Sequence, residues 1–238
     1  LASNYLSEIA KEIKTEADVF IPELMSEQKP GKFESFNAYF GLVNGMTLTG
    51  IQAFRRTFPW SVHGFACYRK DLMLEHATGA ITKINKFNAD ELITRKIFLN
   101  SDLVTITNGQ YFHTKNQESL TKKMSLHHLG FVETERRLFE FCYDHDPGWI
   151  DKVFSSSVKK CFDVTLRFVW YKSEFKPDEW QQVCVTLKEW HKDLRGHGSV
   201  FSLFKSHSVL WSTLFCCFMI NINTVYLIKV MQIIRGRK

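Results

Sequence analysis

Residues 103–114, LVTITNGQYFHT, decide the fold class, because they carry a strong β signal in a sequence whose other patterns are mostly helical. β-branched residues flank the pair Asn108-Gly109, which favours the positive φ angles of a tight type I′ turn. This stretch therefore predicts a β-hairpin. A further strand is predicted at residues 162–170, where apolar and polar residues alternate as they do in a strand with one buried face.

Amphipathic helices are predicted on both sides of these β segments. Apolar residues recur at spacings of three and four in residues 4–21, and Pro22 is expected to end or kink that helix. The same periodicity predicts helices in residues 65–77, 87–99, 130–143, 149–161 and 177–198. The sequence therefore predicts an α+β fold that is mostly helical.

Three regions are expected along the chain. Residues 1–30 would form an N-terminal amphipathic helix and a loop, and residues 31–198 an α+β globular body. Residues 209–228, VLWSTLFCCFMININTVYLI, carry no charge, and a helix of this length crosses a hydrocarbon core of about 30 Å. We therefore predict a single transmembrane helix with a basic tail in residues 209–234. A buried helix of the protein core is the alternative.

The residues around this segment fit a membrane span. Trp211 and Tyr226 lie near its two ends, where aromatic belts occur, and Lys229 and Arg235 lie beyond it as flanking cations. Polar amides are costly in lipid, so Asn221 and Asn223 are predicted to contact another membrane helix.

This arrangement predicts a tail-anchored protein of an intracellular membrane, with its main domain in the cytosol. The chain begins at Leu1 rather than Met, so a processed chain or a piece of a longer protein is also expected. In a longer protein, the apolar segment would be the first of several spans.

The composition excludes some classes of protein, and the positions of the charged residues show where the net positive charge arises. With 45% hydrophobic and 24% charged residues, the chain is neither disordered nor fibrous. Its net charge of +6 suggests nucleic acid at first, but acidic and basic residues balance up to Asp193. The whole excess comes from residues beside or after the apolar segment, namely Arg195, Lys205, Lys229, Arg235, Arg237 and Lys238. The charge is therefore interpreted as a membrane-flanking feature.

Cysteine spacing and motif searches give little sign of catalysis. None of the six cysteines is spaced as Cys-x-x-Cys, which indicates free thiols in a reducing compartment rather than a zinc or redox motif. Gly-x-Ser-x-Gly, Walker, Gly-x-Gly-x-x-Gly and His-Glu-x-x-His motifs are all missing from the sequence. We therefore expect no cofactor and no metal.

Two alternatives remain open. The turn Asp144-His145-Asp146 combines residue types that bind metals or form a base, so a metal-dependent hydrolase is one of them. Basic pairs near exposed aromatic residues would suit a soluble RNA-binding protein of the nucleocapsid type. These pairs are Arg55-Arg56, Lys122-Lys123, Arg136-Arg137 and Lys159-Lys160.

The leading hypothesis is a non-enzymatic, membrane-anchored interaction or assembly subunit. Its expected partners are a membrane and other proteins, and nucleic acid is the less favoured partner.

Overall fold

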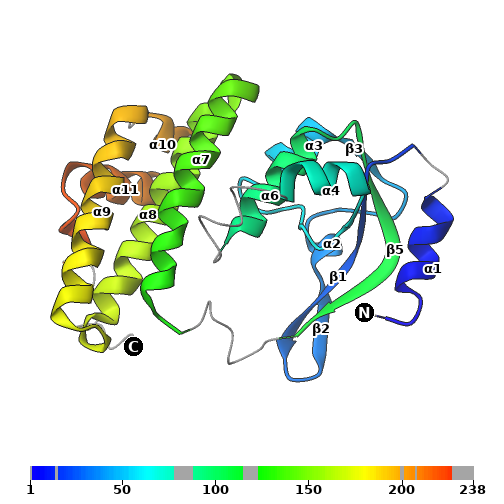
Figure 1. Ribbon diagram of the computed structural model, residues 1–238, viewed down its shortest axis with the longest axis horizontal. Helices are drawn as coiled ribbons and strands as arrows, with labels where there is room; N and C mark the ends of the chain where they lie inside the picture. The colour runs from blue at the N-terminus through cyan, green and yellow to red at the C-terminus, as the bar shows by residue number, and fades with distance from the viewer. Residues whose placement is uncertain are drawn as a thin grey trace. The chain divides into compact units, whose positions relative to one another are not determined.

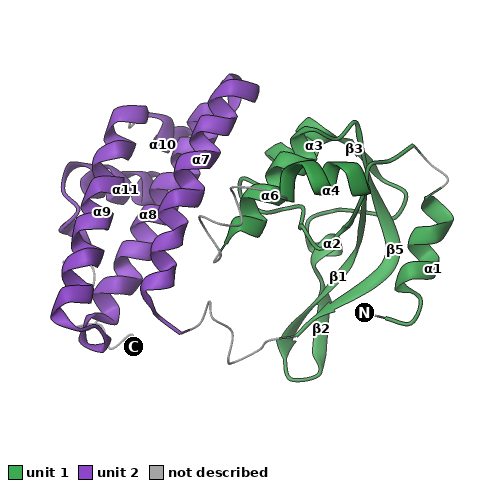
Figure 2. Ribbon diagram, viewed as in Figure 1, with its two compact units in different colours: residues 1–117 green, residues 118–238 purple. Residues whose placement is uncertain are grey.

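The structure is a computed structural model that describes residues 2–13, 16–77, 88–114, 123–198, 201–206 and 208–226. The chain divides into unit 1, Leu1–Gln117, and unit 2, Glu118–Lys238 (Figure 2). Unit 1 contains a mixed β-sheet with helices, and the described part of unit 2 is helical. The prediction of a mostly helical α+β fold is confirmed.

Unit 1 is built on a five-stranded sheet in the order β2-β1-β5-β3, with β4 paired to the start of β1 (Figure 1). The two central strands, β1 and β5, run parallel, and Val19 at the start of β1 pairs with Val104 of β5, both of them fully buried. The strands are β1 (Val19–Lys29), β2 (Lys32–Ser35), β3 (Thr47–Thr49), β4 (Cys67–Tyr68) and β5 (Leu103–His113).

The predicted hairpin at residues 103–114 is wrong, because Asn108-Gly109 lies inside the single long strand β5. The register between β1 and β5 shifts between Ile21 and Glu23 of β1, where β5 accommodates extra residues. Pro22 lies at this shift, and a proline has no N–H to give to the ladder. The Asn-Gly pair therefore marks an irregularity in a strand, which local turn signals do not distinguish from a hairpin.

Gly109 is also a point of close approach to α1 (Tyr5–Glu12). A Cβ atom at Gly109 would lie 2.9 Å from the backbone oxygen of Tyr5.

The helix predicted over residues 4–21 is too long: α1 ends at Glu12, and the chain enters β1 at Val19. The β-branched and aromatic residues that begin β1 pack in the sheet instead of extending the helix.

The other helices of unit 1 are α2 (Phe36–Tyr39), α3 (Gly50–Arg55), α4 (Lys70–Ala77) and α6 (Ala89–Leu99). The helix predicted at residues 87–99 is confirmed as α6, with Asp90 and Glu91 in its first turn. The start of α3 lies against the end of α6. A Cβ atom at Gly50 would lie 2.0 Å from the backbone oxygen of Ser101, so this packing requires glycine.

Asp18 joins three segments at the start of the sheet. Its side chain is buried, and Oδ2 accepts the backbone N–H of Asp102 at 2.6 Å and that of Leu103 at 3.4 Å. Its other oxygen pairs with the guanidinium of Arg69, just before α4. This one carboxylate therefore fixes the starts of β1 and β5 together with the approach to α4.

Unit 2 is arranged around one central helix, α8, which contacts α7, α9, α10 and α11. Helices predicted at residues 130–143 and 177–198 are confirmed as α7 and α9, and the helix begun at 149–161 continues through α8. The α-helices are α7 (Gly130–His145), α8 (Ile150–Trp170), α9 (Pro177–His197), α10 (Phe201–Ser206) and α11 (Val209–Ile220).

The strand predicted at residues 162–170 is wrong, because these residues form the second half of α8. Several helices cover α8, so apolar residues lie on more than one of its sides. Phe162, for example, packs against Phe215 and Phe218 of α11 at ring-centroid distances of 5.5 and 5.4 Å. A helix buried on several sides can therefore show the alternation that usually indicates a strand.

The expectation of a transmembrane helix over residues 209–228 is not supported. Helix α11 has 12 residues and ends at Ile220, and among the described helices none has the length and apolarity to cross a bilayer. Ser212, Phe215 and Phe218 are fully buried in unit 2. An uncharged run can be covered by protein as well as by lipid, and here α8 and α9 cover one face of it.

Candidate functional site

The three residues Asp144, His145 and Asp146 are not brought together as a site. His145 donates from Nδ1 to the backbone oxygen of Phe141 at 2.9 Å, and its ring packs on the Phe141 ring. Asp146 is buried beyond the end of α7, whereas Asp144 is exposed. No group of three or more His, Cys, Asp or Glu side chains that could hold a metal occurs in the part of the chain that the structure describes.

The predicted membrane-contact residues lie at and beyond the end of α11. Asn221 is exposed, and its Oδ1 accepts the backbone N–H of Asn223 at 2.9 Å. Trp211 and Tyr226 are partly exposed, with 49% and 39% of their surface accessible. Lys229 and Arg235 lie outside the described residues.

Helices α10 and α11 expose several large apolar side chains, and we call the five on α10 and in the first turn of α11 the apolar patch. Both helices also have a buried side, where Ser212 Oγ donates to the backbone oxygen of Leu203 at 3.0 Å and so joins them. The patch consists of Phe201 (76% exposed), Phe204 (48%), Val209 (74%), Leu210 (78%) and Trp211 (49%). Its members lie on both sides of the connection between α10 and α11.

A cavity of about 780 Å³ lies in unit 2 between α7 and α9, and we call it the α7–α9 groove. Phe139, Trp190 and Leu194 are buried and supply apolar lining, together with half-buried Ile150 from α8. The remaining lining residues are Arg136, Glu140, Tyr143, Asp144, Asp193, Gly196 and His197. The groove is thus apolar in its buried part and polar at its edges.

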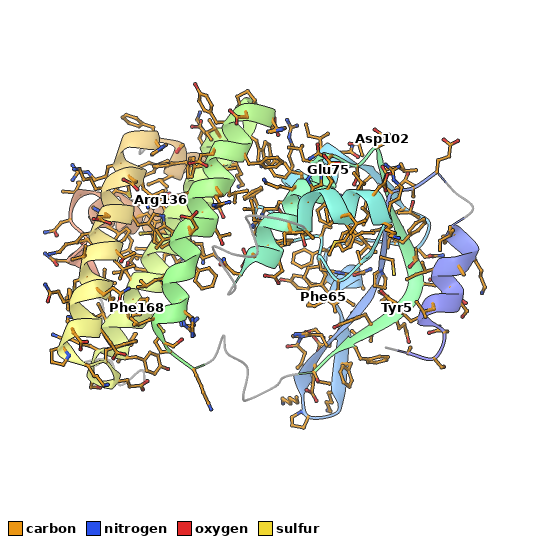
Figure 3. All side chains as sticks on the ribbon, viewed as in Figure 1. Tyr5, Phe65, Glu75, Asp102, Arg136 and Phe168 are labelled. Carbon is orange, nitrogen blue, oxygen red and sulfur yellow. The ribbon has the colours of Figure 1, made fainter. Side chains whose placement is uncertain are left out.

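The two walls of this groove meet at one end. The guanidinium of Arg136, labelled in Figure 3, forms an ion pair with Asp193 of α9. One turn farther along, the ring of Phe139 lies 5.5 Å from the ring of His197, whose Nδ1 donates to the backbone oxygen of Asp193 at 2.6 Å. These contacts close the groove across one turn of each helix.

Two of the basic pairs that suggested RNA binding, those of α7 and α8, are engaged within unit 2, whereas Arg55-Arg56 lie in unit 1 at the end of α3. Lys160 lies 4.5 Å from the centre of the Phe131 ring, and Lys122 is outside the described residues. Three further cations form ion pairs: Arg136 with Asp193, Arg137 with Glu133, and Lys159 with Asp163. Their charge is partly neutralised by these partners.

Unit 1 carries an aromatic stack that the sequence did not single out. The rings of Phe65 and Tyr111 are nearly parallel at a centroid distance of 4.9 Å, and His113 lies 5.4 Å from Phe65. Phe65, labelled in Figure 3, is 41% exposed. Tyr111 and His113 are two residues apart on β5, so the sequence places their side chains on the same face of the strand. Phe65 is distant in the sequence, and only the fold brings it beside them.

A buried histidine lies beside this stack. His63 Nε2 donates to the backbone oxygen of Pro22 at 3.0 Å and to Asn37 Oδ1 at 3.1 Å. Burial lowers the pKa of His63 to about 4, although the bond to Pro22 acts in the opposite direction. The imidazole is therefore neutral at physiological pH, and Nδ1 has no hydrogen-bond partner among the described residues.

The α7–α9 groove was not predicted from the sequence, although the residue pattern of one of its walls is visible there. Arg136, Glu140, Tyr143 and Asp144 recur at spacings of three and four on α7, opposite the positions that pack on α8. Such a stripe of charged and aromatic residues is typical of an exposed helix face. Only the approach of α9 turns it into one wall of a cavity.

Comparison of the chain with protein-family models, curated proteins and solved structures finds no match.

Proposed function

We propose that this chain is a peripheral membrane protein, an interaction or assembly subunit that the apolar patch holds on a lipid surface. The observation that carries the proposal is the exposure of Val209 and Leu210, at 74% and 78%, beside Trp211. Large apolar side chains that face water in a group often mark a contact with a membrane or a protein.

Surface attachment needs less apolar length than a span. Side chains that enter the boundary between headgroups and acyl chains are buried only about 5–10 Å deep, and Trp favours this boundary. Complete burial of a Leu or Val side chain contributes about 1.5–3 kcal/mol. Several such side chains together are therefore sufficient for reversible binding.

The charge distribution supports an anionic surface as the partner. The sequence excess of six basic residues lies entirely after Asp193, in the part of the chain that carries the patch. Lys205 of α10 is exposed within the patch region. A basic residue near an anionic membrane contributes about 1 kcal/mol to attachment.

The reducing side of an intracellular membrane is the proposed location. All six cysteines are thiols that form no disulfide, and two of them, Cys142 and Cys161, are buried. Free thiols are typical of compartments that keep them reduced. The two folded units would then face the cytosol.

Vesicle co-sedimentation tests this proposal. The full chain should bind vesicles of phosphatidylcholine and phosphatidylserine. The variant Val209→Ser/Leu210→Ser should bind roughly tenfold more weakly, because it loses about half of the free energy gained when the two apolar side chains are buried in lipid. Leu6→Ser/Val43→Ser is the matched control, because these residues are 67% and 63% exposed in unit 1. Equal binding by both variants and the parent chain would contradict the proposal.

A second candidate, single-stranded RNA binding, is favoured by the exposed Phe65 ring that stacks on Tyr111. Aromatic rings on a sheet stack with bases and contribute about 1–3 kcal/mol per base. Phe65→Ala should then weaken RNA binding roughly tenfold, while Tyr39→Ala, at an 82% exposed ring on α2, should not. Absence of RNA binding at low salt would exclude this candidate.

A further inference from the structure

The α7–α9 groove exists because its walls have unequal lengths beyond their contact. Arg136 meets Asp193 and Phe139 meets His197, so the two helices run in the same direction here. Helix α9 then ends at His197, whereas α7 continues to His145. Residues 140–145 of α7 therefore extend past the end of α9, and Ile150 at the start of α8 lines the space beside them.

The side chains on this extension are not used within the fold. Glu140, Tyr143 and Asp144 line the groove, and their side chains form no hydrogen bond or ion pair with any described residue. Tyr143 is 71% exposed, although its ring could cover apolar surface. In contrast, the one guanidinium of the groove, that of Arg136, is already paired with Asp193.

The electrostatics of the open end are negative for two independent reasons. Glu140 and Asp144 are carboxylates without a neutralising partner among the described residues. Because α7 and α9 run in the same direction, the groove also opens at the C-terminal ends of both helices, where the helix dipole is negative. The two nearby histidines, His145 and His197, each donate Nδ1 to a backbone oxygen of their own helix.

The lining below these carboxylates is apolar. Phe139, Trp190 and Leu194 are buried, with at most 7% of their surface exposed. A ligand that fits must therefore combine an apolar face with positive charge. A cavity of about 780 Å³ between two helices is large enough for several side chains, as in complexes where an amphipathic helix lies in a groove.

We infer that the α7–α9 groove binds a basic amphipathic segment of a partner protein. Its apolar side chains lie on Phe139, Trp190 and Leu194, and its Lys or Arg side chains pair with Glu140 and Asp144. The charge of the groove disfavours RNA phosphates and anionic lipid headgroups as occupants. None of these groove residues belongs to the apolar patch.

Fluorescence anisotropy with a designed peptide tests the inference on the full chain. The probe is a labelled helical peptide with leucines on one face and lysines on the other. The parent chain should bind it, and Glu140→Gln/Asp144→Asn should weaken binding about tenfold, because two charge pairs are lost. The same peptide with glutamate in place of lysine should not bind.

Two controls make the result specific. Glu174→Gln/Asp178→Asn removes the same charge from exposed positions before and at the start of α9, and it should bind like the parent chain. Val209→Ser/Leu210→Ser should also retain peptide binding, which separates the groove from the apolar patch. The inference is overturned if the lysine peptide does not bind, if the glutamate peptide binds equally well, or if both acidic double variants lose the same affinity.

Discussion

His191 of α9 donates from Nε2 to the backbone oxygen of Phe218 in α11, at 2.7 Å, inside unit 2. The ring of Phe218 also packs edge-on against the His191 ring at a centroid distance of 5.1 Å. A carbonyl oxygen accepts only, so this bond requires a proton on Nε2. The contact fastens the uncharged helix α11 to α9.

This attachment predicts a large effect for one apolar residue of α11 and a small effect for another. Phe215→Ala should lower the free energy of unfolding by about 3–5 kcal/mol, because the ring is 1% exposed and its loss leaves a cavity. Leu210→Ala should change it by less than about 0.5 kcal/mol, because that side chain is 78% exposed. Urea unfolding followed by circular dichroism measures both values. Equal small effects would mean that α11 is not packed in unit 2.

The partners of Arg69 provide a second matched pair. Asp18→Ala should lower the free energy of unfolding by about 2–4 kcal/mol, because it leaves the N–H groups of Asp102 and Leu103 without their acceptor. Asp71→Ala removes another Arg69 partner, at 2.7 Å, but this pair is exposed to solvent, so its loss should lower the free energy of unfolding far less than Asp18→Ala does. Thermal or urea unfolding distinguishes the two. A cost for Asp71→Ala as large as that for Asp18→Ala would contradict this assignment.

Two glycines should respond to alanine with opposite signs. In Gly50→Ala the new Cβ would lie 2.0 Å from the backbone oxygen of Ser101, so α3 must move away from α6 and stability should fall by at least about 2 kcal/mol. A Cβ at Gly196 near the end of α9 meets no atom within 4 Å, and Gly196→Ala should raise stability by about 0.5–1 kcal/mol. Unfolding curves of the two variants in the same buffer give the comparison.

Protonation of His63 should destabilise unit 1 at low pH. Its pKa in the folded chain is lowered by burial to about 4 from 6.5, so between these values the unfolded chain binds more protons than the folded one. The stability contribution is complete above pH 6.5 and falls as the pH drops toward 4, by about 3 kcal/mol in total. Burial lowers the pKa of His191 as well, which adds a loss of the same sign in unit 2.

The test is the pH dependence of urea unfolding. His63→Gln should be less stable than the parent chain at neutral pH but should lose less stability on acidification. His127→Gln, at an exposed histidine in unit 2, is the control and should keep the parent slope. An unchanged slope in His63→Gln would show that other groups cause the acid sensitivity.

Local chemistry was sufficient to predict several helices. Pro177 with Asp178 and Glu179 begins α9 at a proline followed by acids, and Asp90 and Glu91 lie in the first turn of α6. These signals act within one turn of the helix, so they do not depend on the rest of the fold. The amphipathic stripe of α7 was predictable for the same reason.

The wrong predictions of secondary structure occur where contacts with residues distant in the sequence determine the conformation. Asn108-Gly109 has the local chemistry of a turn, but the residues on both sides of it pair with Ile21 and Glu23 of β1 and so keep it within β5. The alternation in residues 162–170 has the period of a strand, but these residues belong to a helix that four other helices contact. In both cases tertiary contacts outweigh a weak local preference.

The sequence by itself determined the α+β class, the positions of α7 and α9 and the concentration of positive charge after Asp193. Tertiary structure alone decided that Phe215 and Phe218 are covered by α8 and α9 while Val209 and Leu210 face solvent. It also placed Glu140 and Asp144 beside the apolar lining of the α7–α9 groove. The physical reason is that hydrophobicity favours the removal of a side chain from water, whereas only packing determines which other surface covers it.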